Sequence, residues 1–263
     1  MIDKKEFLLQ YIIKAYIEHL EPIGSTQLKS MYDITYSPAT IRGYFKKLGE
    51  EGYLAQEHIS SGRTPTTEAL KQYWQSKLNL KLKGLNLRAL EYFASEIGLS
   101  VFIKKEKSDV LKDILNVENK YMILEFSSFA ISVKYSDALY RFLNDMIGLD
   151  LKDITKVSKD VGAYEVYESI NQTLQNSDFQ IFNYKEFLNL ALNYDFDEYT
   201  INSFLKGQIL DELTEGLYFD KLLPANYIGI CNYCKINNED VKMLVIGELP
   251  KDYEYFYEKI TTF

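Results

Sequence analysis

Residues 37–66, SPATIRGYFKKLGEEGYLAQEHISSGRTPT, decide the fold of the N-terminal part of this 263-residue chain. Ser37 and Pro38 favour a helix start, because a serine N-cap accepts a bond from an unpaired backbone N–H and proline at the first helical position lacks that donor anyway. Ile41, Phe45 and Leu48 follow at i, i+4 and i+7 and predict one buried stripe. The opposite, polar face of the predicted helix holds Ser37, Thr40, Arg42, Gly43, Lys46 and Lys47.

A two-stranded hairpin is predicted directly after this helix. Residues 49–52 end the helix, residues 53–58 have the composition of a strand, and residues 59–62 form a glycine-containing turn. Residues 63–65 return as a second strand. A further helix beginning at Thr66 is expected to cover the unit, with an apolar face formed by Ala69, Leu70, Tyr73, Trp74 and Leu78.

Two more helices are predicted upstream of the quoted stretch. Apolar residues at helical spacing predict an amphipathic helix over 4–20, which Pro22 and Gly24 end. Ser25 is the expected N-cap of a second, short helix. Three helices, a two-stranded wing and a covering helix make a winged helix-turn-helix, which we expect over residues 1–83.

The remaining residues alternate between strand and helix patterns. Strands are predicted over 121–126 and 129–135, which would form a hairpin, and over 227–233 and 241–248; helices are predicted over 85–97, 137–147, 164–174, 184–192, 199–217 and 252–260. A helix-rich stretch thus lies between two pairs of strands. We therefore expect an α+β sheet domain in two parts, 84–135 and 199–263, interrupted by a helical insertion over 136–198.

Charge is distributed unevenly along the chain. The net charge is −8, yet residues 1–83 contain 12 Lys and Arg against 9 Asp and Glu, whereas residues 84–263 contain 18 against 29. The first part is therefore at +3 and the second at −11. An acidic body would repel DNA everywhere except at the basic end, which confines contact to one surface.

The sequence also indicates where the protein acts. No secretion signal is recognisable, and the longest run without a charged residue, 222–234, has 13 residues, fewer than the roughly 20 that span a bilayer. A reducing cytoplasm is the expected location. The two cysteines, Cys231 and Cys234, form an isolated C-x-x-C pattern, and both histidines lie in the other predicted domain, so no metal or cofactor site is expected.

The outer helix face and the wing contain the candidate DNA-binding residues. The planar guanidinium of Arg42 suits guanine, and Arg63 beside the wing turn suits the minor groove. Alternatives are open: Lys46 and Lys47 can instead pair with Glu50 and Glu51 at i+4, Ser37 can act only as a cap, and Thr40 can simply be solvated. His58 can be a structural histidine. The full candidate set is Ser37, Thr40, Arg42, Lys46, Lys47, His58, Ser60, Ser61, Arg63 and Thr64.

Four motifs in order resemble the family of heat-inducible transcription repressors HrcA: EPIGS at 21–25, SPATIR at 37–42, GYL at 52–54 and HISSGRTPT at 58–66. Beyond residue 80 the resemblance is looser and rests on Leu143-Asn144 with Gly148, Leu151 and Ile154, and on IGELP at 246–250. Two departures stand out. Gly43 occupies a position where the family usually has asparagine, and the family's glycine-proline-arginine-methionine run after the last strand is absent.

The resemblance implies a homodimeric repressor that binds the CIRCE inverted repeat in front of chaperone operons. It also implies a GAF-like second domain interrupted by a dimerising insertion, and activity that depends on the GroE chaperonin and falls on heating. Two other classes stay open. One is a regulator gated by a small molecule in the GAF-like domain, against which the many large aromatic residues indicate a filled core; the other is a chaperone-recruited interaction module with residual DNA affinity.

An enzyme is not expected. The sequence contains no G-x-x-x-x-G-K-[S/T] phosphate loop, no G-x-G-x-x-G motif and no G-x-S-x-G nucleophile elbow. The acidic cluster DFDE at 195–198 is typical of a solvated helix start rather than of an acid/base pair.

Overall fold

The computed structural model has a mixed α+β fold that divides into two compact units. The first unit comprises Met1–Ile103 with Gln180–Phe263, and the second, which we call the inserted unit, comprises Lys104–Phe179. The structure describes residues 4–56, 58, 61–79, 82, 84–105, 109–174 and 179–262. Within these ranges, no helix combines the length and the apolar character needed to cross a membrane.

The N-terminal elements follow the predicted order, and local caps explain most of their bounds. Ser37 Oγ accepts from Thr40 N at 3.1 Å, and Thr66 Oγ1 accepts from Ala69 N at 3.3 Å. The expected Ser25 cap is wrong: Gly24 is the N-cap, and its N–H donates to Gln27 Oε1 at 3.3 Å. The elements are α1 (Lys4–His19), α2 (Ser25–Tyr32), α3 (Pro38–Glu50), β1 (Leu54–Ala55), β2 (Thr64–Pro65) and α4 (Thr67–Lys77).

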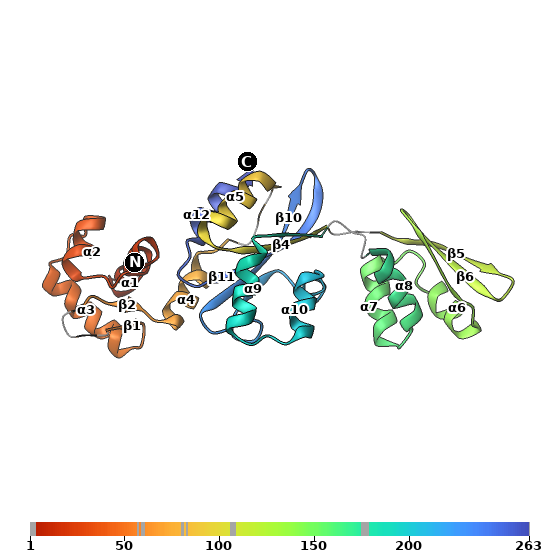
Figure 1. Ribbon diagram of the computed structural model, residues 1–263, viewed down its shortest axis with the longest axis horizontal. Helices are drawn as coiled ribbons and strands as arrows, with labels where there is room; N and C mark the ends of the chain where they lie inside the picture. The colour runs from red at the N-terminus through yellow and green to blue at the C-terminus, as the bar shows by residue number, and fades with distance from the viewer. Residues whose placement is uncertain are drawn as a thin grey trace. The chain divides into compact units, whose positions relative to one another are not determined.

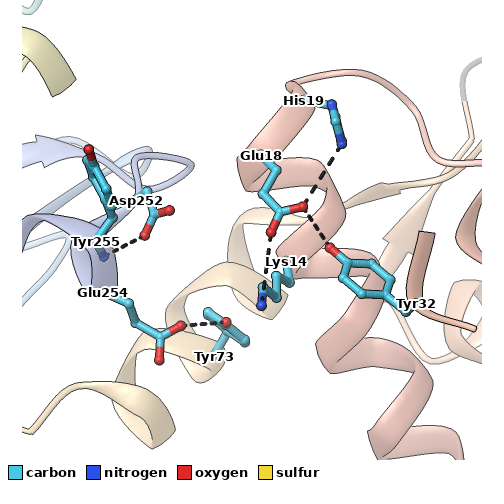
Figure 2. Close-up of polar contacts among 8 residues, drawn as sticks. All are labelled: Lys14, Glu18, His19, Tyr32, Tyr73, Asp252, Glu254 and Tyr255. Carbon is cyan, nitrogen blue, oxygen red and sulfur yellow. Dashed lines mark hydrogen bonds and ion pairs between the residues drawn. The ribbon is translucent and has the colours of Figure 1, made fainter. Parts of the chain in front are cut away.

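A polar cluster joins α1 to α2 (Figure 2). Tyr32 Oη donates to Glu18 Oε2 at 2.9 Å, while Lys14 Nζ and His19 Nε2 each lie 4.0 Å from the Glu18 carboxylate. Burial, together with the hydrogen bond to Glu18, raises the pKa of Tyr32 well above its usual value. The phenol therefore keeps its proton and holds α2 against α1.

The first unit contains a sheet in which β10 pairs with β11 and β9 antiparallel and with β3 parallel. Its strand order among the described residues is β12-β3-β10-β11-β4-β8, with β9 also paired to β10. The centre is the long hairpin of β10 and β11, whose register runs from Tyr227 opposite Glu248 to Ile236 opposite Glu239. The strands are β3 (Gly84–Leu85), β4 (Ser100–Lys105), β8 (Phe179–Phe182), β9 (Gly216–Tyr218), β10 (Tyr227–Ile236), β11 (Glu239–Glu248) and β12 (Thr261–Thr262).

Helices cover both faces of this sheet. In Figure 1, α5 (Leu87–Ile97) and α12 (Tyr253–Ile260) lie on one side of the strands, and α9 (Tyr184–Asn193) and α10 (Glu198–Leu205) lie on the other. Phe102 of β4 contacts Phe187 and Phe204, with ring centroids 5.4 and 5.6 Å apart. Its neighbours Val101 and Ile103 join the core on the opposite face, because successive strand side chains alternate. Such strands are buried on both sides.

The inserted unit has a smaller three-stranded antiparallel sheet in the order β5-β6-β7. Its inward-facing residues, among them Met122, Leu124 and Val133, pack with Leu143 and Ile154 of the neighbouring helices. The elements are β5 (Leu111–Val117), β6 (Tyr121–Phe126), β7 (Ala130–Lys134), α6 (Asp137–Asn144), α7 (Leu151–Asp160) and α8 (Tyr164–Leu174).

The structure draws the internal boundaries differently from the expected 84–135, 136–198 and 199–263. The predicted hairpin of β6 and β7 forms, but it pairs with β5 in its own sheet and so belongs to the inserted unit. At the other end, α9 returns to the first unit. The helix expected over 199–217 is wrong: α10 ends at Leu205, Gly207 adopts φ +70°, and only α11 (Ile209–Glu212) follows before β9.

Candidate nucleic-acid interface

Helix α3 has one buried and one exposed face. Ile41, Phe45 and Leu48 are buried among α1, α2 and the hairpin, as their spacing predicted. The residues predicted to face outward are all exposed, namely Ser37, Thr40, Arg42, Gly43, Lys46 and Lys47. The face is therefore polar, contains three cations and lacks a side chain only at Gly43.

The N-terminal end of α3 presents two linked hydroxyl groups. Ser37 Oγ accepts from the backbone N–H of Thr40, and the two side-chain oxygens lie 2.9 Å apart in a further hydrogen bond. Ser37 is thus a cap, and both hydroxyls remain exposed at a helix N-terminus, where backbone N–H groups and the helix dipole favour an anion. This end of the helix suits a phosphate.

The three cations of α3 differ in their contacts. Arg42 Nη1 donates to Ser25 Oγ at 3.3 Å, which uses one of its five N–H donors and orients the guanidinium toward the start of α2. Lys46 Nζ lies 3.9 Å from Glu50, so the predicted i, i+4 pair exists. The alternative pairing of Lys47 with Glu51 is not what the structure has: Glu51 binds Lys5 at 2.7 Å, and Lys47 Nζ lies over the Tyr44 ring, 5.8 Å from its centroid.

The connection between β1 and β2 is closed by its own hydrogen bonds. Ser61 Oγ accepts from His58 N at 3.1 Å and donates to His58 O at 2.7 Å. Gln56 Nε2 donates to Ser61 O at 3.1 Å. His58 is exposed, whereas the hydroxyl of Ser61 is already engaged within the loop. Ser60 lies outside the residues that the structure describes.

Arg63, expected beside the wing turn, is held by backbone pairing rather than lying in an unpaired loop. It pairs with Ile23 in an antiparallel bridge in which each N–H donates to the other carbonyl at 2.9 Å, and its side chain is half-buried. A Cβ on Gly62 would lie 2.6 Å from the Pro22 carbonyl, so only glycine permits this approach. Thr64, in β2, pairs with Ala55. Backbone pairing therefore fixes the base of the wing against the α1–α2 connection.

The bridge between Ile23 and Arg63 had a weak sequence signal. Ile23 is a buried apolar residue between the helix breakers Pro22 and Gly24, a pattern typical of a short extended segment. Nothing in the local sequence, however, identifies its partner. The structure brings the first and last of the four quoted motifs together at this bridge.

The two cysteines are buried on opposite faces of β10. Cys234 packs in the core that includes α12, whereas Cys231 lies on the side of Lys242. Burial raises the pKa of Cys231 to about 11 and that of Cys234 to about 12, so both thiols are protonated at neutral pH. Over the described parts of the chain, His, Cys, Asp and Glu form no group of three that could hold a metal ion.

Comparison with known proteins identifies similar chains along the full length. The HrcA C-terminal domain family matches residues 74–263. Heat-inducible transcription repressors HrcA from two Helicobacter pylori strains, J99 and 26695, are each 30% identical over 99% of this chain and 95% of their own length. A crystal structure of a hypothetical protein, 18% identical, superposes with a TM-score of 0.50 over 98% of this chain and 96% of that chain, a likeness of fold alone.

Proposed function

Because this chain belongs to the HrcA family of heat-inducible transcription repressors, we propose that it represses chaperone operons by binding a CIRCE-type inverted repeat as a homodimer. The observation that supports this most directly is the face of α3. Three cations and two hydroxyls are exposed there, while the opposite stripe is buried. The face lies in residues 1–83, the part of the sequence with a positive balance of charge.

In this proposal the N-terminal elements act as a winged helix-turn-helix, and α3 enters the major groove. Arg42 reads a guanine, for which the planar fork of a guanidinium is suited. Ser37 and Thr40 contact a phosphate at the helix N-terminus, and Lys46 and Lys47 contact the flanking backbone. Gly43 contributes no base contact, so less sequence information comes from this helix than from one with asparagine there.

The wing contributes the remaining contacts. Arg63 enters the minor groove, whose negative potential attracts arginine, while His58, Ser60, Ser61 and Thr64 contact the adjacent backbone. The bridge of Arg63 to Ile23 supports this role, because its backbone is already held in place and loses little conformational entropy on binding. Ser61 would contact DNA through a hydroxyl that also closes the loop.

The rest of the chain serves assembly and regulation in this proposal. The sheet of the first unit is the GAF-like domain, and the inserted unit, Lys104–Phe179, is the dimerising part. A dimer is expected because one winged helix reads too few base pairs to stand out among the competing sites of a genome. The repressor acts in the cytoplasm, depends on the GroE chaperonin for its active form, and has no catalytic role.

Gel-shift titration with an operator duplex and a scrambled duplex tests the role of α3. Arg42→Ala is expected to weaken operator binding by about 1–3 kcal/mol while changing scrambled binding less. Lys47→Gln is expected to weaken both duplexes equally and to reduce the salt slope by about one. The control is Arg88→Ala, an exposed arginine on α5, which should change neither.

Equal losses on both duplexes for Arg42→Ala would reduce Arg42 to a phosphate contact. Unchanged binding of both duplexes by both α3 variants would contradict the proposed interface as a whole. Adding GroE before and after mild heating, in the same assay, tests the proposed dependence on the chaperonin.

A further inference from the structure

A surface hollow of about 220 Å³ lies in the first unit, at the ends of β10 and β11. Its apolar lining includes Phe187, Leu190, Ile246 and Gly247. Polar side chains surround it, namely those of Ser100, Glu186, Asn189, Asn193, Tyr227, Glu248 and Lys251. Sites for drug-sized ligands occupy about 300–1,000 Å³. This hollow therefore suits a smaller molecule and is too small for a nucleotide.

Fixed charges of both signs surround the hollow. Tyr227 Oη donates to Glu248 Oε1 at 3.3 Å, and burial together with the Glu248 charge raises the pKa of Tyr227 to about 12, so the phenol remains a donor. A Cβ on Gly98, the left-handed C-cap of α5, would lie 3.2 Å from Lys251 Nζ. The ammonium thus lies at a helix C-terminus, where the dipole favours a cation.

Among the described residues, two of these charged groups have no ionic partner. Within the described residues, neither Glu186 nor Lys251 forms an ion pair within 4.0 Å, although both line the same hollow. Two carboxylates and one ammonium leave the hollow with an excess of one negative charge. A ligand that carries one carboxylate and two ammonium groups would balance all three.

We propose that this hollow binds a free basic α-amino acid such as lysine. The ligand carboxylate pairs with Lys251, and its two ammonium groups pair with Glu186 and Glu248. Asn189 and Asn193, which also line the hollow, supply further hydrogen bonds in this proposal. Phosphorylated ligands are disfavoured, because two carboxylates would face their negative charge.

The chain segment that contains the lining residue Glu248 also binds Trp74 of α4, and we call these contacts the Trp74 anchor. Trp74 Nε1 donates to Leu249 O at 2.7 Å, and Tyr253 Oη donates to Glu248 O at 2.9 Å. The rings of Trp74 and Tyr253 meet edge to face with centroids 5.1 Å apart. A Cβ on Gly247 would lie 2.7 Å from Tyr253 Oη, so the segment is packed without free space.

A ligand that binds Glu248 and Lys251 therefore acts on the segment that holds Trp74. A second contact, Tyr73 Oη to Glu254 Oε2 at 3.2 Å, joins α4 to α12 in the same region (Figure 2). Since α4 follows β2 of the proposed wing, occupancy of the hollow would bias the DNA-binding elements. The binding step itself does not depend on the proposed function, because it can be measured without DNA.

The test uses the full chain and its single tryptophan. Trp74 fluorescence, with calorimetry in parallel, is followed during titration with L-lysine. Saturable binding with a millimolar or lower dissociation constant is expected. Glu186→Gln and Lys251→Met should each weaken it by about tenfold or more, which corresponds to about 1.4 kcal/mol. Glu91→Gln, an exposed carboxylate on α5 outside the hollow, is the matched control and should bind like the unsubstituted protein.

Cadaverine, which has two amines but no carboxylate, tests the role of Lys251 separately from the roles of Glu186 and Glu248. It should bind more weakly than lysine to the unsubstituted protein, and Lys251→Met should strengthen its binding, because the substitution removes an ammonium that repels the two amines. Equal binding of lysine and cadaverine would overturn the role of Lys251. If calorimetry shows no saturable binding of L-lysine up to a concentration on the order of 10 mM, the proposal is overturned. Such a result means a binding free energy weaker than about −3 kcal/mol.

Discussion

The two larger sheets among the described residues bury their apolar side chains in different ways. In the first unit, β4, β10 and β11 have apolar side chains on both faces, and helices cover both. In the inserted unit, β6 alternates strictly, with Met122, Leu124 and Phe126 buried. The outward neighbours on β5 and β6, Leu115, Val117 and Tyr121, are 42%, 40% and 51% exposed.

Helices on both faces remove apolar side chains from water on two sides of the first sheet, whereas the open face of the second leaves apolar side chains exposed. A substitution in the helices on either face of the first sheet should therefore lower the free energy of unfolding. Side chains on the open face of the second sheet contribute little to folding. Because they are apolar and exposed, they are suited to contact another protein chain. The following substitutions test this difference.

The largest effect on the free energy of unfolding is expected from α9, one of the helices that cover the first sheet. Phe187 is fully buried, with Phe204 4.6 Å away and Phe102 5.4 Å away between ring centroids. Phe187→Ala should lower the free energy of unfolding by about 3–5 kcal/mol, through lost apolar contact and the cavity left behind. Urea unfolding followed by circular dichroism and by Trp74 fluorescence measures it, and Trp74 belongs to the first unit.

Tyr121→Ala is the matched aromatic truncation on the open face. Its effect on unfolding should stay within about 0.5 kcal/mol, as for most exposed sites. Comparable losses for the two substitutions would remove the distinction between a covered and an open sheet.

An intermediate effect is expected at Asp109, which fixes the turn between β6 and β7. The buried carboxylate accepts from Val110 N, Ser127 N and Ser128 N at 2.8, 2.6 and 3.0 Å, and from Ser128 Oγ at 2.5 Å. Asp109→Asn should destabilise the inserted unit by about 1.5–3 kcal/mol, the range for hydrogen bonds to a charged group. The loss should appear in circular dichroism and leave the Trp74 transition unchanged.

The same residue predicts a pH dependence. Burial raises the pKa of Asp109, but hydrogen bonds from Ser128, Val110 and Ser127 outweigh burial and hold that pKa below its usual range. A carboxyl whose folded pKa is lowered stabilises the fold fully above its unfolded pKa of about 3.9, and this contribution is lost as the pH falls through the folded pKa. The difference in the free energy of unfolding between the unsubstituted protein and Asp109→Asn should therefore shrink below about pH 4. A constant difference down to acid unfolding would contradict a charged Asp109.

The smallest effect on folding is expected at Leu115, on the open face. Leu115→Glu should change the free energy of unfolding by no more than about 0.5 kcal/mol, because the side chain is already exposed. If this face contributes to the proposed homodimer, the dissociation constant should rise by about tenfold or more, which sedimentation equilibrium measures. Lys112→Glu, also exposed on β5, is the control, and unchanged association of Leu115→Glu would exclude this face from the interface.

Features that depend on residues close together in the sequence could be predicted, whereas pairing between distant segments could not. The Ser37 cap of α3 and the stripe of Ile41, Phe45 and Leu48 depend on residues within one or two turns, and these predictions are confirmed. Strands β4 and β5 went unrecognised, and β6 and β7 were assigned to the other sheet. Burial on both faces removes the alternating pattern from β4, and no local signal specifies which strand pairs with which.

The sequence by itself determined the helices of the N-terminal region, the asymmetry of charge, the exposed residues of α3 and the family resemblance, because each depends on neighbouring residues or on composition. Only the tertiary structure decided that Arg63 pairs with Ile23, that Glu51 binds Lys5 rather than Lys47, and that residues far apart in the chain surround one hollow beside the Trp74 anchor. These are contacts between distant segments, and packing rather than spacing selects them.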